Sequence, residues 1–191
     1  DVVLEFQSDL QRRLGREPLA YILGYKEFWS YTFEVTPDVL VPRPETEHLI
    51  ESVLQYFPDP NTELLIADIG TGSGCIAITL ALEYPNAEVM ACDISEAALH
   101  VARRNAEHLG VADRMHFFVG DLYHALPSGK ECDVIVSNPP YVSADEMLDL
   151  EPELMCEPRF ALTDEDTGLT LLAQLLKDAP SYLKEDGILI L

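Results

Sequence analysis

From residue 63 to the end of the chain, short apolar segments alternate with segments of helical periodicity. The apolar segments predict strands at 64–69, 88–93, 115–119, 133–137 and 188–191. Between them, the periodicity predicts helices at 73–84, 95–109 and 169–183. This alternation favours an α/β fold whose doubly wound, mostly parallel sheet is covered by helices on both faces. Ligands of such sheets bind beyond the carboxyl ends of the strands, where the strand order reverses.

A glycine-rich loop follows the first predicted strand and opens a helix. It reads Asp68-Ile69-Gly70-Thr71-Gly72-Ser73-Gly74. Glycines let the backbone approach a ligand closely, and the first turn of a helix offers unpaired N–H groups. The spacing Gly-x-Gly-x-Gly departs from the Gly-x-Gly-x-x-Gly of dinucleotide-binding loops. We therefore predict a ligand-binding loop of another kind, with a purely structural turn as the alternative.

Acidic residues end the second and third predicted strands. Asp93, followed by Ile94, stands where a carboxylate accepts both ribose hydroxyls of an adenosine. The alternative is a residue that only helps to start the helix capped by Ser95. Asp121 suits an adenine amino group, and Leu122 suits the face of its ring. An ordinary turn between strand and loop is the alternative there.

The fourth predicted strand ends in Asn138-Pro139-Pro140-Tyr141. The two prolines restrict the backbone and remove two N–H donors, which leaves carbonyl oxygens as acceptors. Beside them stand the amide oxygen of Asn138 and the ring of Tyr141. Such a cradle suits a planar –NH2 group, because two acceptors hold its hydrogens while the nitrogen lone pair faces an electrophile. A plain Pro-Pro turn needs neither the Asn nor the Tyr.

The first third of the chain has a different pattern. An amphipathic helix is predicted at 2–14 and a short helix from Pro18 to Gly24. Aromatic and β-branched residues predict a β-hairpin over 25–42. A helix then begins at Pro44 and ends before Pro58.

Charge and cysteine usage limit the classes of partner. With 34 Asp and Glu against 12 Lys and Arg, the formal net charge is −22. A stable grip on nucleic-acid phosphates needs a Lys/Arg face, and an anionic membrane surface likewise attracts basic segments. There is also no apolar run of about 18 residues that would span a membrane. The four cysteines and five histidines show no metal-ligand spacing, so we expect no metal and a reducing, cytoplasmic setting.

Together these residues resemble the class I S-adenosylmethionine-dependent methyltransferases. The glycine-rich loop matches their first motif, Asp93 their ribose-binding acid, and Asn138 to Tyr141 the motif of amino-group methylators. The chain is more closely similar to the peptide chain release factor glutamine N5-methyltransferases, the HemK/PrmC family. That likeness also rests on Glu17-Pro18-Leu19-Ala20-Tyr21-Ile22-Leu23-Gly24, Phe28, Val41-Pro42-Arg43-Pro44-Glu45-Thr46-Glu47 and Glu157-Pro158-Arg159-Phe160-Ala161-Leu162.

The resemblance implies a division into three parts and a Rossmann-like sheet. Residues 1–24 resemble the tail of an N-terminal helical domain that docks the substrate, and 25–42 a hairpin linker. Residues 43–191 resemble the methyltransferase domain without its C-terminal end, so we expect the chain to be part of a longer protein. Two places depart from the family's pattern. Leu122 stands where an aromatic residue is common, and 163–168 replaces a glycine-rich step.

The resemblance also implies the ligands. S-adenosyl-L-methionine, which becomes S-adenosyl-L-homocysteine, would contact Asp68, Gly70, Thr71, Gly72, Ser73, Gly74, Asp93, Ile94, Asp121, Leu122 and Asn138. Asp68 would pair with its ammonium group, directly or through water. The substrate would be the Gln of the GGQ motif of class 1 release factors, held by Asn138, Pro139, Pro140 and Tyr141. We expect a monomer that binds no nucleic acid directly. Pro42, Arg43 and Thr46 are further candidates for the same pocket, although Arg43 would equally pair with Glu45 or Glu47.

Three other functions remain as alternatives. An amino-group methyltransferase that acts on DNA or RNA uses the same Asn-Pro-Pro-Tyr logic, but it needs a basic groove. Residues 144–157 instead carry Asp145, Glu146, Asp149, Glu151, Glu153 and Glu157. A nicotinamide oxidoreductase is disfavoured by the glycine spacing. The third alternative is a catalytically silent binding module, which the intact Asn138-to-Tyr141 motif disfavours.

Overall fold

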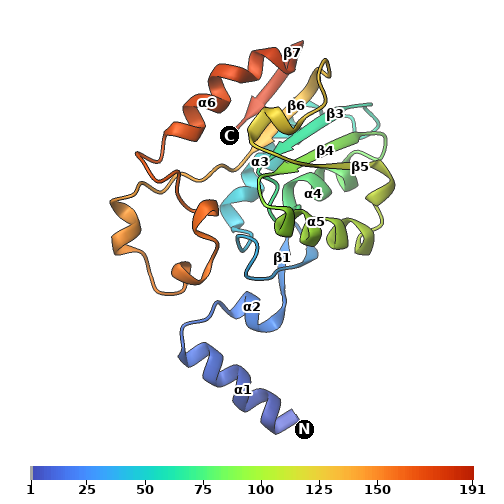
Figure 1. The fold of residues 1–191 in the computed structure, drawn as a ribbon. Coiled ribbons are helices and arrows are strands. Elements are labelled where there is room, and N and C mark those ends of the chain that lie inside the picture. The colour runs from blue at the N-terminus through green and yellow to red at the C-terminus, as the bar shows by residue number, and fades with distance from the viewer. Residues whose placement is uncertain (1) are drawn as a thin grey trace.

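The computed structural model describes residues 2–191 and confirms the predicted α/β fold (Figure 1). Five strands form one parallel sheet in the order β5-β4-β3-β6-β7. Their bounds are β3 Leu65–Ile69, β4 Glu88–Asp93, β5 Met115–Val119, β6 Cys132–Ser137 and β7 Leu183–Ile190. β7 begins five residues before the predicted position, because its first half continues through the polar residues 184–186.

Side chains of the central strands alternate between two apolar layers. Ile66, Val89 and Val134 face a layer built with residues of α3 (Glu47–Tyr56), α4 (Cys75–Glu83) and α5 (Glu96–His108). Their neighbours Ala67 and Ile135 face the opposite layer, which includes residues of α6 (Thr170–Asp178). Both faces of the sheet are therefore covered, as its nearly continuous apolar strands require.

Helix α4 lies directly beneath the glycine-rich loop and is buried along most of its length. Its residues Cys75 to Ala81 are all buried. The helix begins two residues later than predicted because Gly74 has φ +82°, a left-handed conformation outside the helix. A Cβ on Gly74 would lie 2.8 Å from Ile78 Cδ1 and 3.1 Å from Ala102 Cβ of α5. Glycine at this position therefore allows α4 and α5 to pack closely.

The N-terminal elements confirm most of the predicted boundaries. Helices α1 (Val2–Leu14) and α2 (Leu19–Leu23) lie where the sequence places them, and α1 extends away from the sheet (Figure 1). The hairpin of β1 (Tyr25–Phe28) and β2 (Tyr31–Glu34) is shorter than the predicted 25–42. Residues 35–42 instead form an extended segment, because Val35, Val39 and Val41 pack against α2 and α5 rather than against a partner strand.

Other short elements are 3-10 helices. They are Pro44–Thr46, Ala112–Arg114, Leu122–Ala125, Glu146–Asp149, Leu154–Cys156, Arg159–Ala161 and Ala179–Ser181. The first precedes α3, which therefore starts three residues after Pro44. The last follows α6, which ends at Asp178 rather than at the predicted residue 183 because Pro180 interrupts it.

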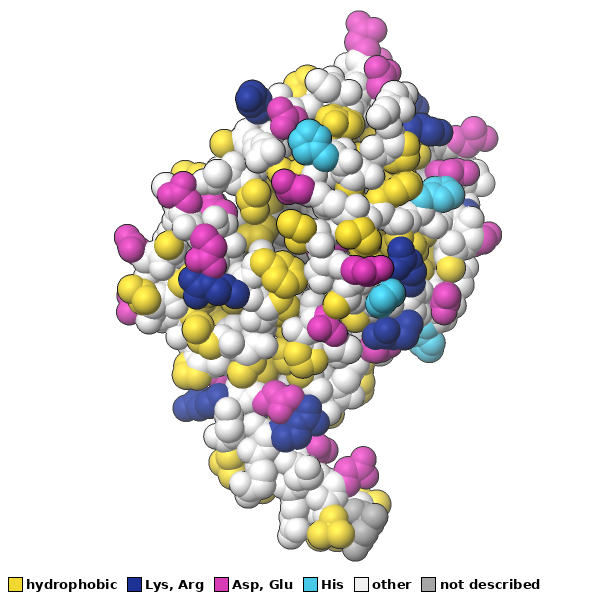
Figure 2. All heavy atoms as spheres, in the orientation of Figure 1, with side chains coloured by type: hydrophobic (Ala, Val, Ile, Leu, Met, Phe, Trp, Pro, Cys, Tyr) yellow, Lys and Arg dark blue, Asp and Glu magenta, His cyan; other side chains and the backbone are white. Residues whose placement is uncertain are grey.

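Acidic side chains are spread over the face shown in Figure 2, whereas apolar side chains gather in its middle. Within the described residues, no helix is both long enough and apolar enough to cross a membrane.

Candidate functional site

The strand order reverses between β3 and β6, which are neighbours in the sheet. From β3 the chain continues to β4 on one side, and from β6 to β7 on the other. Ile69 and Ser137, the last residues of β3 and β6, are paired in register. The Ser137 hydroxyl donates a hydrogen bond of 2.6 Å to the Ile69 carbonyl oxygen. Gly70 and Asn138 therefore leave the sheet side by side, at the switch point where α/β sheets bind ligands.

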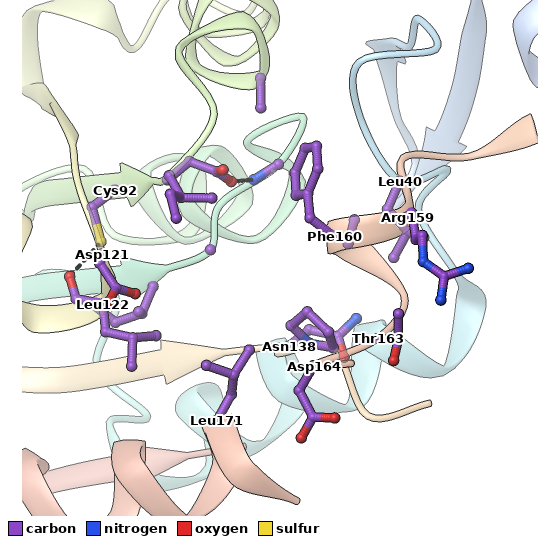
Figure 3. Close-up of a pocket in the computed structure, with 18 of the residues that line it drawn as sticks. Leu40, Cys92, Asp121, Leu122, Asn138, Arg159, Phe160, Thr163, Asp164 and Leu171 are labelled. Carbon is purple, nitrogen blue, oxygen red and sulfur yellow. Dashed lines mark hydrogen bonds between the residues drawn. The ribbon is translucent and has the colours of Figure 1, made fainter. Parts of the chain in front are cut away.

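A cavity of about 560 Å³ opens at this point (Figure 3). It brings together residues that follow the first four of the five predicted strands. Of the predicted site residues, eight line it: Gly70, Gly72, Asp93, Ile94, Asp121, Leu122, Asn138 and Pro140. Gly70 and Gly72 have φ of +74° and +55°, and a Cβ on either would point into open space. The loop thus presents bare backbone to the cavity.

Six predicted site residues lie outside the cavity lining: Asp68, Thr71, Ser73, Gly74, Pro139 and Tyr141. Thr71 and Ser73 belong to the loop but are buried, and the Ser73 carbonyl oxygen accepts a hydrogen bond from Asn105. Tyr141 is 67% exposed and does not line the cavity.

Asp68 is fully buried behind the glycine-rich loop. Its Oδ2 accepts a hydrogen bond of 2.6 Å from the Thr71 hydroxyl. Among residues 2–191, Oδ1 has no hydrogen-bond partner. Burial raises the pKa of Asp68 to about 7, because a buried carboxylate loses the hydration of its charge. The position of Asp68 thus supports a role in ordering the loop.

Asp93 bonds to the glycine-rich loop and also lines the cavity. Its Oδ2 accepts a hydrogen bond from Gly72 N, and its Oδ1 accepts one from Ser95 N, both of 2.9 Å. Burial raises its pKa against these two backbone hydrogen bonds. Each carboxylate oxygen has a second lone pair, so Asp93 keeps capacity to accept further hydrogen bonds from a ligand. Ser95 caps α5 by accepting a hydrogen bond from Ala98 N.

The side chain of Asn138 is held from one side. Its Nδ2 donates a hydrogen bond of 3.2 Å to the hydroxyl of Thr46, just before α3. No described residue donates a hydrogen bond to Asn138 Oδ1, which leaves this acceptor available at the cavity.

Pro42, Arg43 and Thr46 were further candidates for the cavity lining, but none of them lines it. Arg43 pairs with Glu157 at 2.5 Å, rather than with Glu45 or Glu47.

The cavity has two walls that the sequence did not assign to it. One is the extended segment Asp38, Val39 and Leu40, and the other comprises Arg159, Phe160, Ala161, Thr163, Asp164, Glu165, Thr170 and Leu171. Figure 3 shows the side chains of Leu122, Phe160 and Leu171 surrounding the cavity from three sides. The family-like stretch 157–162 was a signal for the second wall, but it pointed to no role.

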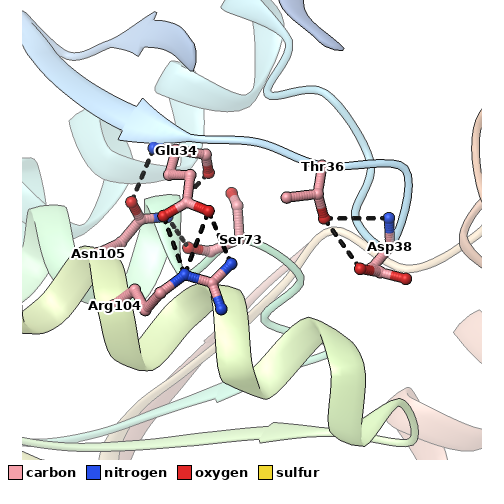
Figure 4. A network of polar contacts seen from close by, with 6 residues as sticks. All are labelled: Glu34, Thr36, Asp38, Ser73, Arg104 and Asn105. Carbon is pink, nitrogen blue, oxygen red and sulfur yellow. Dashed lines mark hydrogen bonds and ion pairs between the residues drawn. The ribbon is translucent and has the colours of Figure 1, made fainter. Parts of the chain in front are cut away.

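Two groups of polar contacts lie at the hairpin and at the first wall (Figure 4). Asn105 of α5 is 1% exposed and bonds to both backbone groups of Glu34, at 2.7 and 3.0 Å. Its Nδ2 also donates a hydrogen bond of 2.9 Å to the Ser73 carbonyl oxygen. Further along the segment, the Thr36 hydroxyl donates a hydrogen bond to Asp38 Oδ2 and accepts one from Asp38 N. Asn105 therefore joins the hairpin to the glycine-rich loop, and the contacts of Thr36 with Asp38 are local to the first wall.

Carboxylates dominate the charge around the cavity. Those that line it are Asp38, Asp93, Asp121, Asp164 and Glu165. The one cationic lining side chain, Arg159, pairs with Glu165. The remaining surface is mostly apolar, so the cavity suits a ligand that combines apolar parts with positive charge. Within residues 2–191, no group of His, Cys, Asp or Glu side chains is arranged to hold a metal ion.

The fold and the site define a methyltransferase. Residues 49–167 match the family model of the methyltransferase small domain, and the chain belongs to this family. This membership decides against the nicotinamide oxidoreductase.

Two solved structures show the same fold. One is the hMettl16 catalytic domain in complex with hairpin 6 of the MAT2A 3'UTR. Its TM-score is 0.65 and its sequence identity is 17%, and the match covers 87% of this chain and 64% of that one. A ribosomal protein L11 methylase from Lactobacillus delbrueckii has a TM-score of 0.52 and 23% identity over 86% of this chain and 69% of that one.

Curated relatives with much higher identity carry the name release factor glutamine methyltransferase. The protein of Neisseria gonorrhoeae is 47% identical over 182 residues, which are 95% of this chain and 65% of that protein. The protein of Bacillus subtilis is 42% identical, over 97% of this chain and 65% of that protein. The chain thus spans about two thirds of the length of these relatives.

Proposed function

We propose that this chain transfers a methyl group from S-adenosyl-L-methionine to the side-chain amide nitrogen of a glutamine in a release factor. The glutamine is that of the GGQ motif of class 1 factors. The observation that carries the proposal is the place of Asn138, whose free Oδ1 borders the cavity that Asp93 and the glycine-rich loop also line. The relatives named release factor glutamine methyltransferase support the choice of substrate.

The residues that line the cavity fit S-adenosyl-L-methionine. The bare backbone at Gly70 and Gly72 leaves room for its amino-acid part, and Asp93 has lone pairs for the ribose hydroxyls. Asp121 is an acceptor for the adenine amino group, with Ile94 and Leu122 as apolar neighbours of the ring. The lining carboxylates favour the positively charged sulfonium, which supplies the methyl group. The buried Asp68 acts through the loop and the Thr71 hydroxyl.

The amide substrate needs acceptors and orientation more than a strong base. An amide nitrogen is a poor nucleophile, because its lone pair is delocalised into the carbonyl group. Asn138 Oδ1 and the Pro139 carbonyl oxygen accept its two hydrogens, which aims the lone pair at the methyl carbon. Orientation of this kind contributes about 7–11 kcal/mol in well-aligned reactions. Tyr141, exposed outside the cavity lining, is available to the polypeptide that carries the glutamine.

The reaction balances without a catalytic base in the motif. The new bond joins the glutamine nitrogen to the methyl carbon, and the carbon–sulfur bond breaks with its electron pair remaining on sulfur. The methylated nitrogen is then cationic and acidic, so a proton leaves to water. The products are N5-methylglutamine and the neutral S-adenosyl-L-homocysteine.

Replacement of Asn138 by alanine tests the proposal. We expect Asn138→Ala to abolish methyl transfer to a purified release factor, because one of the two amide acceptors is lost. Its dissociation constant for S-adenosyl-L-methionine stays close to the wild-type value, since Asp93 and the glycine-rich loop are intact. Calorimetry gives the affinity, and methyl-labelled cofactor gives the rate. The control is Asn86→Ala, an exposed asparagine outside the cavity. Wild-type methylation by Asn138→Ala would refute the proposed role of this residue.

A further inference from the structure

The backbone of the Asn138–Tyr141 segment has few hydrogen-bond donors to fix its position. Pro139 and Pro140 carry no N–H group, so their backbone donates no hydrogen bond. The start of the segment is fixed by β6 and by the bond between Asn138 and Thr46. Its other end leaves the sheet and must be held by a different part of the chain. The position of the amide acceptors thus depends on what contacts residues 141–144.

The turn formed by residues 162–170 makes that contact. Val142 N donates a hydrogen bond of 3.0 Å to the Leu162 carbonyl oxygen, and Ala144 N donates one of 2.9 Å to the Asp166 carbonyl oxygen. Gly168 is buried directly against the backbone of Tyr141 and Ser143. It has φ +78°, and a Cβ there would collide with the carbonyl oxygen of Tyr141.

The side chain of Asp164 organises this turn from within. Its Oδ1 accepts hydrogen bonds from Asp166 N at 2.9 Å and from Gly168 N at 2.8 Å. Its Oδ2 accepts one of 2.8 Å from Thr170 N, at the start of α6. One carboxylate therefore joins the residue that bonds to Ala144, the residue that lies against Tyr141, and the first residue of α6.

The turn keeps its shape with one glycine, Gly168, and an acidic sequence around it. Glu165 has φ +60°, a left-handed conformation that is unfavourable for a residue with a side chain. Its carboxylate forms a two-pronged ion pair with Arg159. Together with the three hydrogen bonds to Asp164, this pair offsets the cost of the glutamate conformation. The turn is thus held by the side chains of Asp164 and Glu165.

We propose that Asp164 is a positioning residue for methyl transfer, acting through Gly168 on the backbone of the Asn138–Tyr141 segment. The inference rests on the proposed function, since the segment is the one that binds the substrate amide. Loss of the Asp164 carboxylate displaces the Pro139 carbonyl oxygen and the amide it would hold. Errors of about 1 Å in such placement cost on the order of 100-fold in rate.

The test compares three variants of the full chain. Asp164→Ala removes all three hydrogen bonds, Asp164→Asn retains an acceptor oxygen for two of them, and Asp166→Ala is the control in the same turn. Asp166→Ala keeps the main-chain carbonyl that bonds to Ala144. We expect Asp164→Ala to lower kcat about 10- to 100-fold. Asp164→Asn falls between it and the wild type, while Asp166→Ala stays within about twofold. In the two Asp164 variants, which lose one of the five lining carboxylates, the dissociation constant for S-adenosyl-L-methionine rises by less than kcat falls. In Asp166→Ala it stays within about twofold.

Hydrogen exchange provides a readout that does not depend on activity. In Asp164→Ala, the amides of Val142 and Ala144 exchange at least about tenfold faster than in Asp166→Ala, because the turn that they bond to is loosened. Unchanged exchange in Asp164→Ala and Asp164→Asn would overturn the inference, whether or not the protein methylates release factors. A loss of cofactor affinity that parallels the loss of kcat would also overturn it, since Asp164 would then act on the cofactor. Absence of methylation by the wild type, with faster exchange in Asp164→Ala, would refute the proposed function alone.

Discussion

At the scale of single residues, Asp68 shows how one carboxylate acts without reaching the ligand cavity. Its burial is costly, and burial accordingly raises its pKa to about 7. The folded protein therefore binds a proton at Asp68 more tightly than the unfolded chain does. Ionisation of the unfolded chain begins near pH 4, so this residue lowers the free energy of unfolding progressively as the pH rises from about 4 to 7. The cost reaches at most about 4 kcal/mol above that range.

Asp68→Asn removes this dependence, because asparagine resembles the protonated aspartic acid at all pH values. We expect the free energy of unfolding of Asp68→Asn, relative to the wild type, to increase by about 2 kcal/mol between pH 5.5 and pH 8. Urea denaturation at the two pH values measures it. The exposed Asp145, replaced by asparagine, controls for the loss of one negative charge. A constant difference between Asp68→Asn and the wild type at both pH values would contradict the buried-carboxylate interpretation.

At the scale of elements, the sheet was predictable from the sequence and the second wall of the cavity was not. Strands such as 88–93 and 115–119 have apolar runs with clear ends, and both occur as predicted. The loop at Gly70 and the segment at Asn138 follow directly from these strand ends. In contrast, residues 142–168 have no periodic pattern, and their course depends on side chains distant in sequence. The partner of Glu157, Arg43, lies 114 residues away.

Asn105 is the side chain through which α5 holds the hairpin and the glycine-rich loop. Replacement by alanine leaves the backbone groups of Glu34 and the Ser73 carbonyl without their partner. We expect Asn105→Ala to lower the free energy of unfolding by about 2–4 kcal/mol, the cost of breaking several buried hydrogen bonds. Arg104→Ala is the matched control on the same helix, since its pair with Glu34 is largely exposed. Its effect stays within about 1 kcal/mol. Equal losses in the two variants, by urea denaturation, would show that burial of Asn105 is unimportant.

At the scale of the whole molecule, the net charge of −22 distinguishes between two substrates that suit the same catalytic motif. Basic side chains are few, and most are already engaged. Within residues 2–191, seven of the twelve form ion pairs with carboxylates: Arg12, Arg13, Arg16, Arg43, Arg104, Arg159 and Lys184. The charged residues described around the cavity are predominantly acidic, and the face in Figure 2 shows no basic stripe. We therefore expect a nucleic-acid backbone to be repelled from this site.

This charge distribution predicts the outcome of a competition between acceptors. The protein is incubated with methyl-labelled S-adenosyl-L-methionine, a release factor, duplex DNA and RNA together. We expect the label in the release factor alone, at a rate that the nucleic acids do not reduce. The rate changes by less than about tenfold between 50 and 200 mM salt, whereas an enzyme that makes six to ten phosphate contacts loses about 10³–10⁵ in affinity over that range. Label in DNA or RNA, lost steeply as salt is added, would instead establish nucleic acid as the substrate and assign the Asn138 cradle to a base amino group.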